Sequence, residues 1–335
     1  MRLPRHLGPL WLVALLPLAG CAEDMSFLAS HGPVADEQRA HILRIALTTG
    51  IVVVPALLLG PFVAWRYRYG AGRRYTPRWD FSWWVEIALW GVPIAITVSL
   101  VLLLLHSTLK LDPYASVSTA DGAEPFEVQV VGYDWKWLFL YPEHGVASVG
   151  ELVWPADRPL RLALTSATVM QSFHIPQLGS QIYAMAGMRT DLNLATEGPG
   201  VFGGQNTQYN GEGFWRQKFV ARALDLADWS AWLEDARLGG LPFDDAARRA
   251  LAARSTKEEL ARALGAHAAS TAPAVAAVPA GVVRFRDVPG DVFATVLEGF
   301  GHAMPPVVAL PADADAAARA ALLCGPAPGD AETAL

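Results

Sequence analysis

Cysteine and histidine, the residues best suited to bind metals, are few and scattered in this chain. The two cysteines, Cys21 and Cys324, cannot form a disulfide framework, and alone they cannot hold zinc or an iron–sulfur cluster. No two histidines stand three or four residues apart, so no helix presents two imidazoles to one metal. The sequence therefore predicts a chain without a metal or redox cofactor of its own. The histidines are His6, His31, His41, His106, His144, His174, His267 and His302.

Cys21 is the cysteine whose surroundings indicate a chemical role. It follows a basic start at Arg2 and Arg5, a short apolar core over residues 8–18, and two small residues. This pattern predicts a lipoprotein signal peptide over residues 1–20, after which a lipidated (palmitoylated) Cys21 becomes the N-terminus. The alternative is an ordinary signal peptide followed by an unrelated cysteine.

Two uncharged apolar stretches predict a transmembrane hairpin within residues 21–118. The helices are expected at about 45–66 and 81–106, and each uncharged run is long enough to cross a hydrocarbon core of ~30 Å. The loop between them is rich in arginine and the outer flanks are acidic or mixed, so the positive-inside rule places the loop in the cytoplasm. The sequence thus predicts a multi-pass protein of the bacterial inner membrane, with the chain beyond the hairpin in the periplasm.

Glu86 is a carboxylate near the start of the second apolar stretch. A carboxylate inside a membrane is costly and usually has a function. However, Glu86 lies only about one and a half helical turns beyond Asp80, so a side chain that reaches interfacial water is the alternative.

The overall composition limits the class of partner. The net charge of -6 argues against nucleic acid, because there is no surplus of basic side chains to neutralise phosphate. Only 17% of the residues are charged and 53% are hydrophobic, which is a low charge content for a soluble protein of this size.

Beyond residue 122 the apolar runs become short and are separated by glycine and proline. This pattern predicts an antiparallel β-sandwich over residues 122–232. Phe126–Val130 alternates as a half-buried strand does. In the aromatic segment that follows, Trp135 and Trp137 are candidates for a membrane interface as well as for core packing. Further strands are expected at Leu160–Thr165, Val169–Ile175, Gln181–Met185, Thr190–Leu194 and Gln217–Ala223.

Residues 233–304 predict helical and aromatic-containing segments. Phe243–Gly265 is rich in Ala, Arg, Leu and Glu, which predicts one surface helix, and residues 266–280 form an Ala/Pro linker. Residues 305–335, which include Cys324, are Ala/Pro-rich and are expected to be a disordered tail.

The loop Gln205–Gln217 resembles the copper loop of subunit II of the haem–copper respiratory oxidases, which reads Cys-Ser-Glu-x-Cys-Gly-x-x-His-x-x-Met. The spacing and Gly211 are retained, but the ligands are not. The segment from Val169 likewise resembles the family strand that carries the first copper histidine. Amides are poor ligands for copper, so the resemblance implies a cupredoxin domain that has lost its copper centre. The ligand positions are occupied by Gln171, Asn206, Gln208, Asn210, Phe214 and Gln217.

Within that family the chain is more similar to the cytochrome bo-type quinol oxidases than to the cytochrome c oxidases. The shared segments are Asp134–Trp137 and Tyr209–Phe214, and Tyr183 stands where the cytochrome c oxidases carry a carboxylate that helps to dock cytochrome c. Val283–Phe300 resembles the C-terminal segment of quinol oxidase subunit II, which could dock on the complex. The resemblance covers residues 18–232 with few gaps.

The resemblance implies a two-helix transmembrane hairpin followed by a cupredoxin-like Greek-key sandwich with a helical and disordered C-terminal extension. It also implies a non-catalytic subunit II of a proton-pumping quinol oxidase, with the haems and the catalytic copper in subunit I. The expected partners are subunit I, smaller membrane subunits, membrane lipid, and quinol as the substrate of the complex, but not cytochrome c. Glu86 and Pro93 match the spacing of a family glutamate near a proton-channel entrance.

Two other functions stay open at this point. One is an exported membrane lipoprotein with a cupredoxin-like binding domain unrelated to respiration. The other is a cytochrome c oxidase subunit II, which the missing ligands disfavour.

Overall fold

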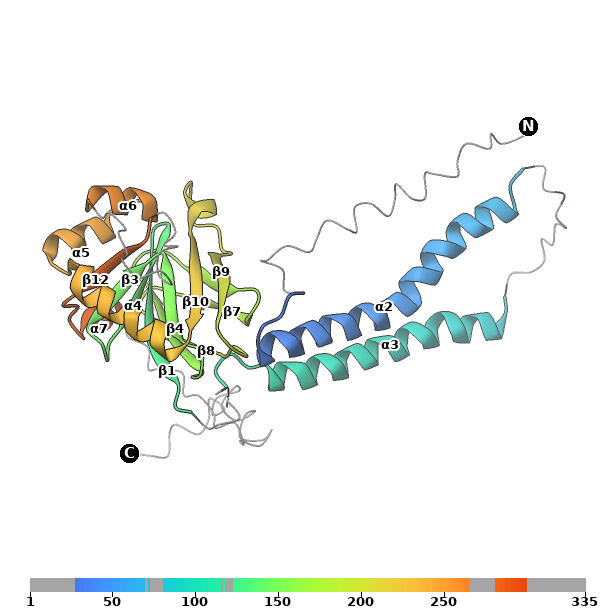
Figure 1. Cartoon of the computed structure of the whole chain (residues 1–335). Coiled ribbons are helices and arrows are strands. Elements are labelled where there is room, and N and C mark those ends of the chain that lie inside the picture. Colours follow the sequence, from blue (N-terminus) through green and yellow to red (C-terminus); the bar gives the residue numbers. More distant parts are fainter. Residues whose placement is uncertain are drawn as a thin grey trace, which may run out of the picture. The chain divides into compact units, whose positions relative to one another are not determined.

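The computed structural model consists of two compact units, which are described separately (Figure 1). One unit is formed by residues 37–112 and the other by the remainder of the chain. The predicted signal peptide with Cys21, the 266–280 linker and the 305–335 tail lie outside the described residues. The structure describes residues 28–69, 72, 81–115, 117, 123–265 and 281–299.

The first unit is a pair of long helices, α2 (Pro33–Arg66) and α3 (Trp83–Lys110). Both are long and apolar enough to cross a membrane, and most of their large apolar side chains are exposed. Each helix extends beyond the stretch that apolar composition alone predicted. Figure 1 shows that α2 bends, which is expected because Pro55 and Pro61 each remove a backbone hydrogen bond inside the helix.

Polar contacts fix the register of the two helices at one end. The ammonium of Lys110 lies 2.9 Å from the carboxylate of Glu37, and Oγ of Ser107 lies 2.7 Å from Nδ1 of His41. The first turns of α2 therefore contact the last turns of α3, and the two helices run antiparallel as a hairpin requires.

The second unit is a β-sandwich of two sheets. The seven-stranded sheet has the order β11-β12-β3-β2-β1-β5-β8, and the five-stranded sheet has the order β4-β10-β9-β6-β7. Most pairs are antiparallel, but β1 runs parallel to β5, β4 parallel to β10, and β11 (Leu241–Pro242) parallel to β12 (Val283–Arg286). Together with the hairpin, this sandwich confirms the predicted fold class. The first ten strands are β1 (Phe126–Tyr133), β2 (Lys136–Tyr141), β3 (Val146–Val149), β4 (Glu151–Pro155), β5 (Leu160–Ser166), β6 (Gln171–Ile175), β7 (Gly179–Ala184), β8 (Thr190–Leu194), β9 (Gly200–Asn206) and β10 (Lys218–Leu224).

The side chains of β2 alternate between two hydrophobic cores. Trp137, Phe139 and Tyr141 point into the core between the sheets, whereas Leu138 and Leu140 point into a second core on the other face of the seven-stranded sheet. Trp137 is only 1% exposed, so it is a core residue, and a membrane-interface role does not fit it.

The C-terminal segment supplies the second core. α5 (Asp245–Ala252), α6 (Lys257–Ala263) and α7 (Val292–Glu298) all contribute buried side chains to it. β11 (Leu241–Pro242) and β12 (Val283–Arg286) extend the seven-stranded sheet, and β12 pairs with β3. The first residues of the segment that was expected to dock on other subunits are thus a strand of the chain's own sheet.

The helices after β10 differ from the prediction in two places. α4 (Leu226–Gly239) continues across the expected domain boundary at Trp232, whose side chain is fully buried. The prediction of one helix over Phe243–Gly265 was wrong, because the chain forms α5 and α6 with a turn between them. The second helix starts at a capping box in which Thr256 and Glu259 satisfy each other's backbone N–H groups. A 3-10 turn at Phe214–Arg216 precedes β10.

Candidate functional site

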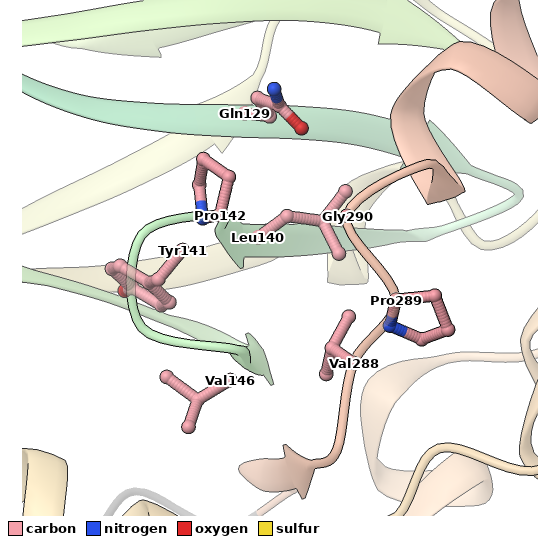
Figure 2. Close-up of a pocket in the computed structure, with 8 residues that line it drawn as sticks. All are labelled: Gln129, Leu140, Tyr141, Pro142, Val146, Val288, Pro289 and Gly290. Carbon is pink, nitrogen blue, oxygen red and sulfur yellow. The ribbon is translucent and has the colours of Figure 1, made fainter.

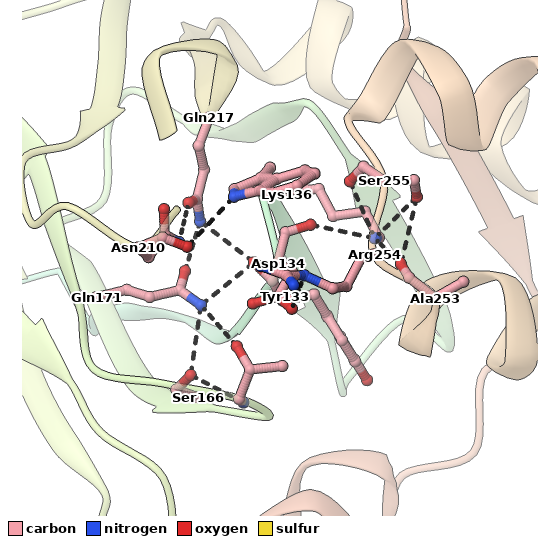
Figure 3. Close-up of polar contacts among 12 residues, drawn as sticks. Tyr133, Asp134, Lys136, Ser166, Gln171, Asn210, Gln217, Ala253, Arg254 and Ser255 are labelled. Carbon is pink, nitrogen blue, oxygen red and sulfur yellow. Dashed lines mark hydrogen bonds and ion pairs between the residues drawn. The ribbon is translucent and has the colours of Figure 1, made fainter. Parts of the chain in front are cut away.

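Four amide side chains from separate elements meet at one end of the five-stranded sheet. Figure 3 labels three of them, Gln171, Asn210 and Gln217. Gln171 begins β6, Asn206 ends β9, Asn210 lies in the loop that follows, and Gln217 directly precedes β10. Because β9 pairs with both β6 and β10, the strand register itself brings these positions together. We refer to the four residues as the amide cluster.

Gln217 is the centre of the amide cluster. Its Oε1 accepts hydrogen bonds from Asn206 Nδ2 at 3.0 Å and from Asn210 Nδ2 at 2.7 Å, and its Nε2 donates to Gln171 Oε1. Gln217 is 1% exposed and Gln171 is fully buried. A buried amide that lost these partners would pay the full desolvation cost of its polar atoms. The cluster is therefore a mutually dependent network.

Backbone groups and hydroxyls complete the network around Gln171. Its Nε2 donates to the carbonyl of Tyr133 at 3.2 Å and to Thr168 Oγ1 at 3.2 Å, with Ser166 Oγ at 3.4 Å. A Cβ on Gly132 would lie 2.6 Å from Gln171 Oε1, so a residue with a side chain would displace the amide.

The remaining two positions of the predicted copper set are placed differently. Gln208 contributes its backbone N–H, which donates to Asn206 Oδ1 at 2.9 Å. Phe214 packs its ring 5.7 Å from the ring of Tyr209. Thus the structure brings together the side chains of four of the six residues that the sequence singled out.

The donor set of the amide cluster does not fit a copper centre. Copper in such domains is bound by imidazole and thiolate, whereas a neutral amide is a poor ligand. Here Gln171, Asn206 and Asn210 are also each hydrogen-bonded to Gln217. Among the described residues, no three His, Cys, Asp or Glu side chains are grouped so that they could hold a metal ion.

Trp135 covers the loop that carries the amide cluster. Its backbone has a φ of 68°, a left-handed conformation that is uncommon for a residue with a side chain. The indole lies so close to Gly213 that a Cβ there would overlap it, and Nε1 donates to the carbonyl of Asn210 at 3.3 Å. Arg254, from the turn after α5, stacks its guanidinium 5.1 Å from the indole centroid.

Lys136 is a buried cation that sequence reasoning missed. It is 2% exposed, and its Nζ donates to the carbonyl of Ala253 at 2.7 Å and to the carbonyl and hydroxyl of Ser255 at 3.2 and 3.1 Å (Figure 3). Burial lowers the pKa of Lys136 to about 8, although the carboxylates of Asp134 and Glu259 oppose this shift. A lysine that opens a strand of apolar residues is the signal in the sequence that could have revealed it.

Glu86 lies in the first turn of α3 and is partly exposed. Trp90, one turn further along, donates a hydrogen bond from Nε1 to Glu86 Oε2 at 3.1 Å. The indole therefore orients the carboxylate while leaving its other oxygen available.

The cavity drawn in Figure 2 lies between the end of β2 and the loop after β12. Leu140, Tyr141, Val288 and Pro289 are among its lining residues, and its volume is about 10 Å³. That is about the space of a single water molecule, so it does not accommodate a substrate.

Comparisons with known proteins identify the family. The family model for the periplasmic domain of cytochrome c oxidase subunit II matches residues 146–214. Cytochrome bo(3) ubiquinol oxidase subunit 2 of Pseudomonas putida is 40% identical over 261 residues, which cover 78% of this chain and 82% of the relative. The chain belongs to the ubiquinol oxidase subunit 2 family. It is therefore a subunit of a quinol oxidase, an oxidoreductase complex, and not an unrelated lipoprotein or a cytochrome c oxidase subunit.

A second relative belongs to the same family, and one solved structure is similar in part. Ubiquinol oxidase subunit 2 of Acetobacter aceti is 38% identical over 245 residues, covering 73% of this chain and 79% of the relative. The solved periplasmic domain of cytochrome oxidase subunit II from Bradyrhizobium japonicum is similar at 23% identity and a TM-score of 0.31, covering 32% of this chain and 91% of that one. Two candidate membrane helices together with a periplasmic-type domain fit an inner-membrane protein.

Proposed function

We propose that this chain is a non-catalytic subunit II, which carries no redox centre while the haems and the catalytic copper of the oxidase reside in subunit I. The observation that carries the proposal is the amide cluster. Gln171, Asn206, Asn210 and Gln217 fill the positions that the family resemblance assigns to copper ligands, and they hydrogen-bond to one another. Electrons from quinol, a lipid-soluble donor, then reach subunit I without a relay in the periplasmic domain.

The second part of the proposal concerns anchoring. The hairpin of α2 and α3 crosses the inner membrane twice, and a lipid on Cys21 adds a further attachment. The β-sandwich then caps subunit I on the periplasmic side. Exposed aromatic side chains in the loop Gln205–Gln217 support this. Tyr209 is 72% exposed and Trp215 is 63% exposed, and such rings favour protein interfaces.

The third part of the proposal assigns Glu86 to the entrance of a proton channel. Its position in the first turn of α3 puts a carboxylate near one end of a membrane helix, where water can reach it. The hydrogen bond from Trp90 holds the side chain in one orientation.

The remaining partners are smaller membrane subunits and lipid, with quinol as the substrate of the complex.

The experiment that tests the copperless assignment uses the assembled oxidase purified from membranes. O₂ uptake is measured with a reduced quinol and separately with reduced cytochrome c, and the near-infrared spectrum is recorded for a two-copper band. We expect uptake with quinol only and no such band. Uptake driven by cytochrome c together with the band would refute the proposal.

Lipid attachment needs a separate test. Mass spectrometry of the mature chain is expected to show an N-terminal Cys21 carrying acyl groups. The Cys21→Ser variant is expected to lack this mass. A mature chain that begins elsewhere, or an unmodified Cys21, would show that the lipid assignment is wrong without affecting the copperless assignment.

A further inference from the structure

The turn between α5 and α6, residues 253–256, is attached to the sandwich at two points. Neither attachment is part of a strand ladder or of a hydrophobic core. One reaches Asp134 in the turn that joins β1 to β2, and the other reaches Lys136, the first residue of β2. Both residues lie more than a hundred positions earlier in the chain.

The first attachment is made by the side chain of Lys136. By the alternation of β2, Lys136 shares the face of Leu138 and Leu140 and so points toward the helices. Its ammonium donates to the carbonyls of Ala253 and Ser255, which belong to the end of α5 and the start of the turn. A cation at the C-terminal end of a helix also interacts favourably with the helix dipole.

The second attachment is made by the side chain of Arg254. Its Nε lies 3.2 Å from Oδ2 of Asp134, and its guanidinium covers the indole of Trp135. The same indole contacts Gly213 of the loop and donates a hydrogen bond to the carbonyl of Asn210. The guanidinium also lies beside the loop, because a Cβ on Gly211 would be 3.2 Å from Nη2 of Arg254. Arg254, Trp135 and the loop thus lie in contact with one another.

The loop itself has no regular secondary structure. Residues 207–213 form no strand or helix, and Gly211 has a φ of +114°, so the backbone of this segment loses much freedom when it is ordered. Inside, the loop is bound through Asn210 to the amide cluster. Outside, it is covered by Trp135.

We propose that the α5–α6 turn is a strap that presses Trp135 onto the loop Asn210–Gly213 and thereby keeps the amide cluster closed. The strap restrains the loop from outside, and Gln217 restrains it from inside. This inference rests on the contacts above and not on the proposed function, so it holds or fails independently of the electron donor.

Hydrogen exchange of the full chain in detergent micelles tests the strap. The reporters are loop amides that donate hydrogen bonds in the structure, those of Gln208, Phe214, Arg216 and Gln217. Arg254→Met keeps the apolar stem but removes the cation. We expect exchange of these amides to become about fivefold faster, because one cation–π contact and one exposed ion pair are lost.

Arg249→Met is the matched control. It removes the same charge from an exposed position of α5. Exchange in the loop is expected to stay at the wild-type rate in this variant, and the amides of β1 are expected to stay unchanged in both. Unchanged loop exchange in Arg254→Met would overturn the strap. So would equal acceleration in both variants, or acceleration that spreads over the whole sandwich.

Discussion

The carboxylate of Glu151 lies 2.6 Å from Nε of Arg284, and this pair joins the first residue of β4 to the late strand β12. Glu151 is fully buried, and its Oε1 also accepts a hydrogen bond from Trp232 Nε1 at 2.9 Å. Arg284 also forms an ion pair with Asp235 of α4. The pair therefore ties the C-terminal segment to the sandwich.

Removal of the Glu151 charge is expected to destabilise the protein strongly. In Glu151→Gln the volume is kept, but Arg284 and the buried Arg222 both lose the carboxylate that they share, and such losses cost about 3–5 kcal/mol of unfolding free energy. Denaturant unfolding of the full chain in micelles measures the loss. Asp287→Asn is the control, because it breaks only an exposed pair with Arg286, which is worth less than about 1 kcal/mol. Equal effects of the two variants would contradict the assigned importance of the Glu151 pair.

Introducing a charge into the amide cluster is expected to make stability depend on pH. In Gln217→Glu the carboxylate would face Gln171 Oε1 and the carbonyl of Tyr133, two acceptors to which Gln217 now donates. Burial and these acceptors favour the protonated acid and raise its pKa in the folded state. The stability of the variant, relative to wild type, should therefore be highest below pH ~4 and fall as the pH rises toward 7.

The matched control for that variant is Gln181→Glu, at an exposed position of β7. Unfolding free energies are compared at pH 4 and pH 7 for wild type and both variants. We expect the Gln217→Glu penalty to grow by about 1–3 kcal/mol over this range, and that of Gln181→Glu to stay nearly constant. A Gln217→Glu penalty that does not change with pH would show that the cluster is open to water.

The lowered pKa of Lys136 predicts a gain of stability in alkaline solution. Between about pH 8 and 10.5 the unfolded chain holds a proton that the folded chain has released, so unfolding free energy rises with pH in this window. The gain reaches at most about 3 kcal/mol. It is measured as the difference between wild type and Lys136→Met at pH 7.5 and pH 10. Lys218→Met, which removes an exposed lysine, controls for net charge. A difference that is the same at both pH values would contradict the assigned burial.

Glu86→Gln tests the proton-channel proposal in the assembled oxidase. The amide can still accept the hydrogen bond from Trp90 but cannot carry a proton. We expect severalfold slower quinol-driven O₂ uptake and slower proton uptake, with unchanged assembly. Ser82→Ala, at the residue before α3, is the control for local helix effects. Turnover and proton uptake at wild-type rates in Glu86→Gln would remove Glu86 from the proton path.

The sequence alone predicted the classes of structure, and the family resemblance indicated which copper-ligand types are replaced. Long uncharged runs need no tertiary information to predict α2 and α3, because the length of an apolar helix is matched to the membrane. Alternation predicted the first five residues of β1, since a strand with one polar and one apolar face repeats every two residues. Short apolar runs bounded by Gly and Pro predicted β5 and β8 closely. The replacement of the copper-ligand residue types at six positions was likewise evident from the sequence, because the resemblance to the family gives those positions.

The tertiary structure decided which of those positions meet and what surrounds them. Four amides form one network because β6, β9 and β10 pair in a particular register, whereas Gln208 contributes its backbone N–H and Phe214 packs against Tyr209. Lys136 is buried because residues 119 positions later return to cover it. Local periodicity contains no record of such long-range contacts, because it reflects only which face of an element is apolar and not what packs against that face.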